Sequence, residues 1–202
     1  MWAEVRGHAE VESSSKFPLV ISTWPFLDAV RSGWTAINAG LSSVDAVVEG
    51  CSTCEVLRCD GTVGPGGSPD ENGESTMDAL IMNGVTALNI DTLDCNDGGW
   101  SCWCHEIRKR WHKSCKAGNA LHRAHNASGY QVVESMRLGM EPKLAAKDAI
   151  ISRRAKKYPN FVGALFAVNK KGTHAGSCYG WTFQYSVRST GIDDLEVVTV
   201  YP

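Results

Sequence analysis

The chain has 202 residues, of which 43% are hydrophobic and 21% are charged, so it is long enough for one ordinary domain with a core. Its formal net charge of −2 gives no general attraction to nucleic acid or to an anionic membrane surface. No apolar run approaches the roughly 18 residues of a membrane-spanning helix. The N-terminal stretch MWAEVRGHAEVESSSK lacks the apolar core of a signal peptide. We therefore expect a cytoplasmic protein, with residues 1–16 as a polar tail.

The first predicted elements are a strand and a helix. The β-branched run at residues 17–23 predicts a buried strand, which leads into Trp24. Residues 27–38 carry apolar side chains at helical spacing, and Gly40 follows as a C′ residue should.

A second helix is predicted over residues 43–55. Ser43 can cap its N-terminus, and Val44, Val47 and Val48 share one face. The next stretch, RCDGTVGPGGSPDENGESTMD at residues 58–78, is too rich in glycine and proline for a helix or a central strand. Because ordered elements are predicted on both sides of it, we interpret this loop as the wall of a binding or catalytic site.

The last third of the chain predicts helices followed by strands. Residues 131–138 form an amphipathic helix stopped by Gly139. A second helix begins at Glu141 and Pro142 and ends in a basic run, and cations suit a helix C-terminus. Residues 161–168 and 181–187 predict a strand pair with hairpin spacing, and residues 193–200 predict a last strand. The order of elements is typical of an α/β layered domain.

Residues 94–125 differ in character from the rest, because rare residue types concentrate there. The segment holds Cys95, Cys102, Cys104, Cys115, His105, His112, His122, His125, Trp100, Trp103 and Trp111. These residues include soft ligands for zinc, but their spacing matches no standard zinc pattern. A basic run at residues 108–110 is typical of solvated surface rather than of a nucleic-acid site. We therefore expect no metal, no cofactor and no nucleic-acid partner.

Two stretches carry a specific resemblance: STWPF at residues 22–26 and CDGTVGPGGSPDENGESTMDALIMNG at residues 59–84. They closely resemble the glycosylasparaginase and type-2 asparaginase (isoaspartyl peptidase) family of N-terminal-nucleophile hydrolases. The likeness covers roughly residues 17–86 and 129–202. It implies a four-layer αββα sandwich, and a threonine-type amidohydrolase acting without a cofactor on the β-amide of asparagine, on β-aspartyl peptides or on N-glycosyl asparagine.

Residues 87–128 interrupt that resemblance, and we interpret them as an insertion with a frameshift. Codons can be chosen for residues 97–125 so that the next reading frame gives MEVGAVGAMRYVKDGIKAARLVMHYTEHT. This string has helical periodicity and resembles what the family places after its Gly-Val-Thr segment, here residues 84–86. The expected product is a single incomplete asparaginase-like domain over residues 17–202, an α/β fold whose central strands are missing.

The resemblance also defines what the site lacks. The family's nucleophile is a threonine freed by self-cleavage at a His-Asp-Thr junction, and its own α-amine serves as the base. No His-Asp-Thr occurs in the chain, and Asp91–Thr92 is the stretch most similar to it. The family's Arg/Asp clamp for the substrate and its Thr-Gly oxyanion donors are absent as well.

Four residues are retained as site candidates by resemblance. Trp24 would line the substrate cleft, and Thr62 would supply a supporting hydroxyl near the nucleophile's amine. Read without the resemblance, Trp24 is a core residue and Thr62 a turn residue. Cys54 and Cys59 match a loop disulfide of lysosomal members, whereas a cytosolic location favours reduced thiols.

Three functional interpretations follow. The first is an amidohydrolase relative that is inert because its nucleophile is absent; its intact relatives would take small asparagine- or aspartyl-amide substrates, some of them in lysosomes or vacuoles. The second is a non-catalytic partner, forming homo- or hetero-oligomers through exposed strand edges without contacting a membrane. The third is a zinc or nucleic-acid module at residues 94–125. We also expect either a molten or aggregating product, or local order only in the two family-like halves, because the missing strands would leave Val20, Ile21, Phe161 and Phe183 uncovered.

Overall fold

The structure is a computed structural model, and it describes residues 17–59, 61, 81–82, 89–90, 103–106, 113–117, 127–158 and 160–202. The predicted polar tail and most of the glycine-rich loop lie outside these residues. Within the described part, no helix is long and apolar enough to span a membrane.

The N-terminal elements follow the sequence pattern closely. They are β1 (Leu19–Thr23), α1 (Leu27–Asn38) and α2 (Ser43–Leu57). The bounds of α1 are those predicted, and Gly40 follows it with φ +81°. Strand β1 is half-buried along its whole length rather than fully buried, because it lies at the edge of its sheet.

Helix α2 differs from its prediction in its cap and in its buried face. The N-cap is Ser42, not Ser43: the Ser42 hydroxyl accepts a hydrogen bond from the backbone N–H of Asp45, and the Asp45 carboxylate accepts one from the backbone N–H of Ser42. Val47 and Val48 are exposed, while the buried residues of α2 are Ala46 and Gly50.

Small residues explain why α1 and α2 pack so closely. A Cβ atom on Gly33 of α1 would lie 2.9 Å from the carbonyl oxygen of Ala46, and one on Gly50 of α2 would lie 2.9 Å from that of Ala29. The two backbones therefore touch at residues without bulky side chains. The valines point elsewhere, because a β-branched side chain does not fit at this separation.

The middle of the chain supplies four short strands. They are β2 (Ile81–Met82), β3 (Asn89–Ile90), β4 (Trp103–Glu106) and β5 (Lys113–Ala117). The last three lie inside residues 87–128, the segment for which order was not expected. Strand β5 pairs antiparallel with β6 over five residue pairs, from Lys113 with Val168 to Ala117 with Ala164. The expectation of local order only in the family-like halves is therefore wrong for these three strands.

The C-terminal part begins with helices. They are α3 (Ala127–Arg137), α4 (Pro142–Lys147) and the π-helix η2 (Asp148–Ala155). Gly139 ends the first of them with φ +96°, as predicted. The helix predicted from Pro142 is continuous in space, but it widens to the π-helical hydrogen-bond pattern at Asp148.

The strands that follow pair differently from the prediction. They are β6 (Gly163–Val168), β7 (His174–Tyr179), β8 (Phe183–Ser189) and β9 (Glu196–Val200). The hairpin partner of β6 is β7, and β8 belongs to the other sheet. Residues 174–179, for which the sequence pattern predicted no strand, form β7. The β7 sequence HAGSCY is poor in strand-forming residues, so pairing with the buried strand β6 decides its conformation.

The described strands form three antiparallel sheets. The first has the order β1-β8-β9, the second is the short pair β2-β3, and the third has the order β4-β5-β6-β7. In the first sheet, Leu19 is opposite Ser189 and Thr23 is opposite Tyr185. Strands from the two family-like parts of the chain thus form one sheet, although many residues separate them in sequence.

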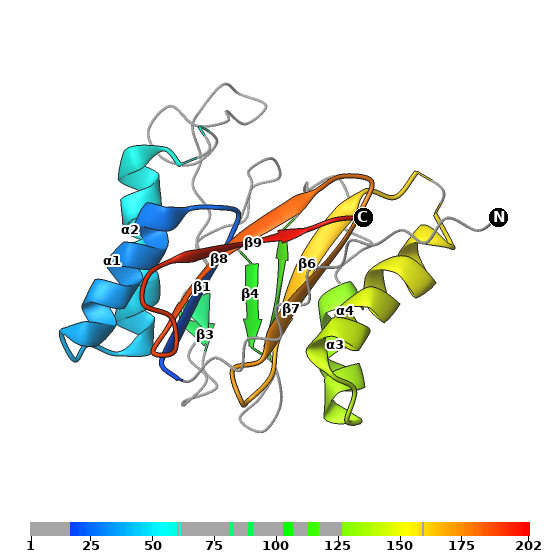
Figure 1. Ribbon diagram of the computed structural model, residues 1–202, viewed down its shortest axis with the longest axis horizontal. Helices are drawn as coiled ribbons and strands as arrows, with labels where there is room; N and C mark the ends of the chain where they lie inside the picture. Colours follow the sequence, from blue (N-terminus) through cyan, green and yellow to red (C-terminus); the bar gives the residue numbers. More distant parts are fainter. Residues whose placement is uncertain are drawn as a thin grey trace.

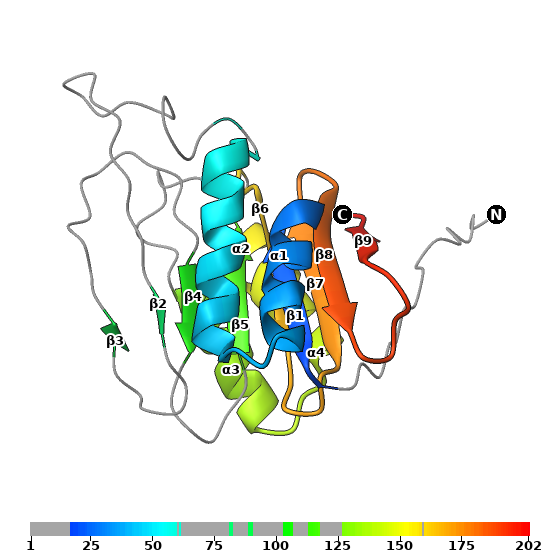
Figure 2. The same ribbon diagram turned by 90° about the vertical axis from the view of Figure 1, so that its left-hand side faces the viewer.

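The layers can be followed in Figures 1 and 2. Helices α1 and α2 lie on one side of the strands, and α3 and α4 lie on the opposite side (Figure 1). Turning the molecule by 90° shows α1 in front of β1 and β8 (Figure 2), which it also contacts. The element contacts agree, because α1 packs on β1 and β8 whereas α3 and α4 pack on β5, β6 and β7.

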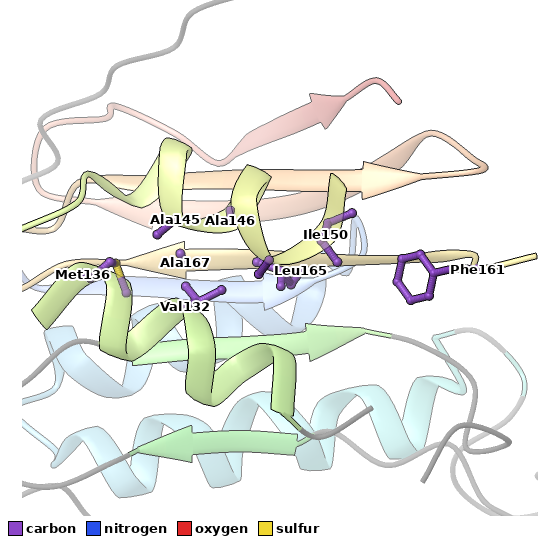
Figure 3. Packing of buried hydrophobic residues seen from close by; sticks show 9 residues of the cluster. Val132, Met136, Ala145, Ala146, Ile150, Phe161, Leu165 and Ala167 are labelled. Atoms are coloured by element: carbon purple, nitrogen blue, oxygen red, sulfur yellow. The ribbon is translucent and has the colours of Figure 1, made fainter. Parts of the chain in front are cut away.

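Strand β6 is buried on both faces and separates two clusters of apolar side chains. Leu165 and Ala167 pack with residues of α3, α4 and η2 (Figure 3). Ala164 and Phe166 point the other way, into a cluster with Phe183 of the first sheet. The alternation along the strand is what a strand between two layers requires.

The expected exposure of apolar residues is wrong for the two phenylalanines. Phe183 is 0% exposed because it lies between the sheets, and Phe161 is 7% exposed because it packs against the helical cluster. Val20 and Ile21 are half-buried. The first sheet therefore has cover on its inner face, and its edge strands among the described residues are β1 and β9.

Candidate active site

Trp24 lies directly after β1 in an unusual backbone conformation. Its φ is +67°, in the left-handed region that costs an L-residue about 1–2 kcal/mol. The Ser186 hydroxyl donates a hydrogen bond to the Trp24 carbonyl oxygen at 3.1 Å. The indole stacks on Trp181, with ring centroids 4.8 Å apart, and meets Phe183 edge-on at 5.8 Å. A strained residue held by its surroundings in this way favours a functional position.

Trp181 is the site residue that the sequence pattern missed. It lies in the connection between β7 and β8, after Gly180 with φ +87°, whereas the pattern placed it in a strand. Trp181 and Trp24 are both half-buried, so they form an aromatic wall at the end of β1. A large aromatic residue next to a glycine turn was the signal that could have indicated it.

A buried His174–Tyr185 pair lies beside this wall. His174 Nδ1 is 2.9 Å from the Tyr185 hydroxyl, and the residues are 2% and 1% exposed. Burial lowers the pKa of His174. Burial, and to a lesser extent the charge of Glu196, raises the pKa of Tyr185 well above its usual value. Both groups are therefore neutral near pH 7, and the histidine is a weak base.

Cys178 is also held in its neutral form. It is buried on β7, where burial raises the pKa of its thiol. Its Sγ donates a hydrogen bond to the carbonyl oxygen of Val200 at 3.3 Å. A protonated, buried thiol is a structural group rather than a nucleophile.

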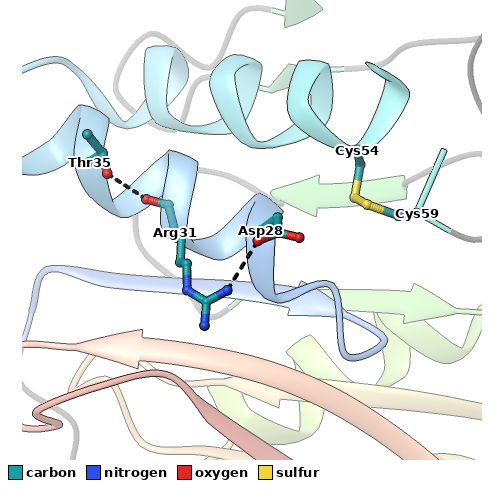
Figure 4. Close-up of polar contacts among 5 residues, drawn as sticks. All are labelled: Asp28, Arg31, Thr35, Cys54 and Cys59. Atoms are coloured by element: carbon teal, nitrogen blue, oxygen red, sulfur yellow. Dashed lines mark hydrogen bonds and ion pairs between the residues drawn. A yellow bond between two sulfur atoms is a disulfide. The ribbon is translucent and has the colours of Figure 1, made fainter. Parts of the chain in front are cut away.

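The other candidates from the sequence are placed only in part. Thr62 lies outside the described residues, so its position relative to Trp24 stays a prediction. Cys54 and Cys59 form a disulfide with their Cα atoms 5.0 Å apart (Figure 4). This bond closes the C-terminus of α2, where Arg58 has φ +52° and the Cys59 N–H donates to the Cys54 carbonyl oxygen at 3.1 Å.

Little of the zinc interpretation falls on described residues. Cys104 of β4 is opposite Cys115 of β5 in the backbone register. Cys95, Cys102, His112, His122 and His125 lie outside the described part, as does the basic run at residues 108–110. Where the structure describes side chains, no group of three or more His, Cys, Asp or Glu residues could hold a metal ion.

Comparison with known proteins assigns the family. The family model described as asparaginase matches residues 5–89, so the match begins within residues 1–16 and ends just past Thr86. The Arabidopsis thaliana protein named "Probable isoaspartyl peptidase/L-asparaginase 3" is 35% identical over 336 residues, which cover 96% of this chain and 93% of that protein. The chain therefore belongs to the asparaginase family, as its resemblance implied.

Two mammalian relatives match a shorter part of the chain at higher identity. The mouse protein named "N(4)-(beta-N-acetylglucosaminyl)-L-asparaginase" is 52% identical over 89 residues, 44% of this chain and 25% of its own length. The rat protein of the same name is 50% identical over 89 residues, covering 44% and 26%. The chain thus spans about a quarter of these two relatives in the matched region.

The Arabidopsis alignment also shows that this chain is shorter than its relative. Its 336 residues exceed the 202 residues of the chain, although both proteins are covered almost from end to end. The additional residues of the relative therefore lie inside the alignment. This agrees with the internal truncation predicted from the sequence.

In the described part of the chain, the aromatic wall of Trp24 and Trp181 has no reacting group beside it. Trp24 and Trp181 offer aromatic surface, and the buried His174, Tyr185 and Cys178 are neutral. In the described part of the chain, this wall carries no activated nucleophile beside a base, which is the arrangement that amide hydrolysis needs.

Proposed function

We propose that this chain is a catalytically inert member of the asparaginase family. The supporting observation is that the internal residues it lacks relative to its Arabidopsis relative coincide with the absence of any His-Asp-Thr sequence in its 202 residues. A hydrolase of the resembled type needs the freed threonine and its oxyanion donors together. Without both, most of the rate acceleration is lost, because attack by the hydroxyl and stabilisation of the developing negative charge are its two main contributions.

We further propose that the fold is a partial αββα sandwich of the N-terminal-nucleophile hydrolase type. The order of packing supports this, since α1 and α2, the three-stranded sheet, the four-stranded sheet, and α3 with α4 follow one another. In this interpretation, Trp24 and Trp181 are the remaining wall of a groove for an asparagine- or aspartyl-amide. Thr62 keeps its proposed role as a supporting hydroxyl.

Aspartate release tests the proposed inertness. Purified full-length chain is incubated with asparagine, a β-aspartyl dipeptide and an N-glycosyl asparagine, with the Arabidopsis relative as positive control. We expect no release above buffer, and a single undivided band at 21.9 kDa on a denaturing gel. Release at the rate of the control, or a self-cleaved pair of bands, would show the proposal to be wrong.

A second candidate is a non-catalytic pairing partner, and the edge of β1 favours it. Strand β1 is an edge strand of the first sheet, with β8 as its neighbour among the described strands. Unpaired strand edges accept a further strand through main-chain hydrogen bonds. We propose an intact relative or a second copy of this chain as the donor of that strand.

Light scattering after size exclusion measures this pairing, alone and mixed with the Arabidopsis relative. In an antiparallel pair, successive N–H groups of β1 point alternately toward β8 and toward the open edge. Of the variants Val20→Pro and Ile21→Pro, one removes an N–H that points toward the open edge. That variant should therefore fold normally and lose the complex. A monomer in every mixture would exclude the pairing role.

A further inference from the structure

The C-terminal end of η2 gathers positive charge on the surface. Residues 153–157 hold no carboxylate and four cations, which are Arg153, Arg154, Lys156 and Lys157. All of them are exposed except Arg154, which is half-buried. Arg153 is partly neutralised, because its Nε lies 2.7 Å from Asp148 Oδ2. The net charge of −2 predicted no membrane contact, since it averages this surface with the negative remainder of the chain, whereas attraction depends on how charge is distributed.

Exposed apolar side chains lie at the same end of the fold. The exposed Tyr158 follows the cations, and its ring centre is 5.7 Å from Lys157 Nζ and 6.0 Å from the guanidinium carbon of Arg154. Val162 begins the approach to β6 and is 54% exposed.

The end of β7 adds a second exposed tyrosine. Tyr179 stacks on Phe161, with ring centroids 6.5 Å apart, and Phe161 is tied to the end of η2 because its N–H donates to the Tyr158 carbonyl oxygen at 2.9 Å. We call the combined area the η2 surface; it consists of Arg153, Arg154, Lys156, Lys157, Tyr158, Val162 and Tyr179.

Two simpler explanations account for part of the η2 surface. Cations stabilise a helix C-terminus through the helix dipole, and single exposed apolar residues are normal on proteins. Neither explains why the cations are grouped with two tyrosines and a valine. This combination is suited to an anionic membrane, because cations attract the lipid headgroups while tyrosine and aliphatic side chains enter the boundary between headgroups and acyl chains.

We propose that the η2 surface is a docking site for an anionic phospholipid membrane. Its charge is complementary to any polyanion, but Val162 distinguishes a membrane from a nucleic acid. A branched aliphatic side chain neither stacks on a base nor forms hydrogen bonds with it, whereas a lipid boundary stabilises it. The ring of Tyr158 already carries two cations, which leaves less of its face for a base. A patch of four cations and three apolar side chains binds reversibly.

Vesicle flotation of the full-length chain tests the proposal. The vesicles are phosphatidylcholine, with or without about one third phosphatidylserine. We expect binding to the anionic vesicles alone. Raising the salt from about 0.1 M to about 1 M should release the protein, because the Debye length falls from about 10 Å to about 3 Å. A molten chain would bind neutral vesicles as well, since its apolar contacts do not require lipid charge.

Paired lysine variants locate the contact. The variant Lys156→Gln/Lys157→Gln should lower the partition coefficient about 30-fold, because each lysine near an anionic surface contributes about 1 kcal/mol. The matched control is Lys170→Gln/Lys171→Gln, which removes the same charge from the turn after β6. That turn is about 20 Å away along the strand, beyond the Debye length, so the control should change binding by less than about twofold.

Val162→Ser tests the choice of a membrane over other polyanions. Burying the exposed half of this side chain is worth about 1 kcal/mol, so the variant should bind anionic vesicles about fivefold less tightly. Its binding to a single-stranded oligonucleotide should be the same as that of wild type.

Four results would overturn the proposal. They are no binding to either vesicle, equal binding to both, an equal loss in the two lysine variants, and an oligonucleotide that binds more tightly than the anionic vesicles. The third would assign binding to the general charge of the chain, and the fourth would assign the cations to nucleic acid. The lipid and salt dependence of wild type needs no variant, so it decides the question even if a substitution prevents folding.

Discussion

Trp24 shows how a single residue can be placed by its surroundings against its own conformational preference. Its left-handed φ of +67° is maintained by the stack on Trp181 and by the hydrogen bond from Ser186. Both partners come from the far end of the chain. The aromatic wall therefore depends on the pairing of β1 with β8, not on the local sequence around Trp24.

His174 should make the stability of the protein depend on pH. Burial lowers its pKa in the folded state, while the unfolded chain keeps a value near 6.5. The unfolded state then binds the proton first, so the stabilisation is complete above about pH 6.5 and is lost as pH falls toward the lowered folded value. The slope is at most about 1.4 kcal/mol per pH unit for one proton.

Urea unfolding at pH 7, 6 and 5 measures this effect. The variant His174→Gln carries no titrating ring, so its free energy of unfolding should fall less steeply between pH 7 and pH 5 than that of wild type. The comparison uses slopes rather than absolute stabilities, because the substitution also alters the contact with Tyr185. Equal slopes would mean that His174 is not responsible.

The sequence indicates some of the site residues and does not indicate others. Trp24 is indicated by the STWPF resemblance, because the family places a tryptophan in that motif. Trp181 is not indicated, because it becomes a site residue only when β8 places it against Trp24. Strand alternation cannot show this, since the contact joins residues far apart in the chain.

The start of α2 offers a test between two adjacent serines. The structure assigns the capping box to Ser42, which exchanges hydrogen bonds with Asp45. Ser42→Ala should lower the free energy of unfolding by about 1 kcal/mol. Ser43→Ala, at the position that the sequence predicts as the cap, should change it by less than about 0.5 kcal/mol. Thermal or urea melts of the two variants measure the difference, and the reverse order would restore Ser43 as the cap.

The close contact of α1 and α2 should be sensitive to a single methyl group. An alanine Cβ at Gly33 or Gly50 would lie 2.9 Å from a backbone carbonyl oxygen, and backbone cannot rotate away as a side chain can. Overpacking costs about 1–3 kcal/mol, against a helix-propensity gain of up to about 1 kcal/mol. We therefore expect a net loss of about 1–2 kcal/mol for either alanine variant.

Gly191→Ala is the control for that pair, since its nearest neighbouring atom would be 3.9 Å away. Urea midpoints of the three variants should separate Gly33→Ala and Gly50→Ala from Gly191→Ala. If all three matched wild type, the helices would not approach each other as the structure shows.

Elements with strong local signals could be predicted, and those decided by pairing could not. The apolar periodicity and Gly40 gave the bounds of α1, and Gly139 gave the end of α3. The hairpin of β6 was assigned to the wrong strand because β7 lacks β-branched residues. Its conformation depends on its neighbour, which a local pattern does not contain.

For the molecule as a whole, the main question is how residues 87–128 relate to the fold. Their composition indicates a shifted reading frame, and transcript sequencing checks this directly: an intact frame through the segment would contradict it. Yet β5 lies between β4 and β6 in the four-stranded sheet. Residues 113–117 therefore belong to that sheet, whatever the origin of the segment.

Lys116→Pro in β5 tests whether this sheet exists. Position 116 pairs with Leu165 of β6, and proline within a central strand removes a ladder hydrogen bond and costs about 3 kcal/mol or more. A sheet as described should therefore lose its cooperative melt, or melt well below wild type, when followed by near-ultraviolet circular dichroism. Lys116→Thr, a good strand former, should melt as wild type does.

Each outcome of that experiment separates the folded from the molten chain. A proline variant that melts like a cooperative wild type would place residues 113–117 outside the core. A wild type without any cooperative transition would favour the molten product expected from the missing segment. If only the proline variant loses cooperative melting, residues 113–117 are a stably paired inner strand. The four-stranded sheet would then be completed by a sequence that does not resemble the family.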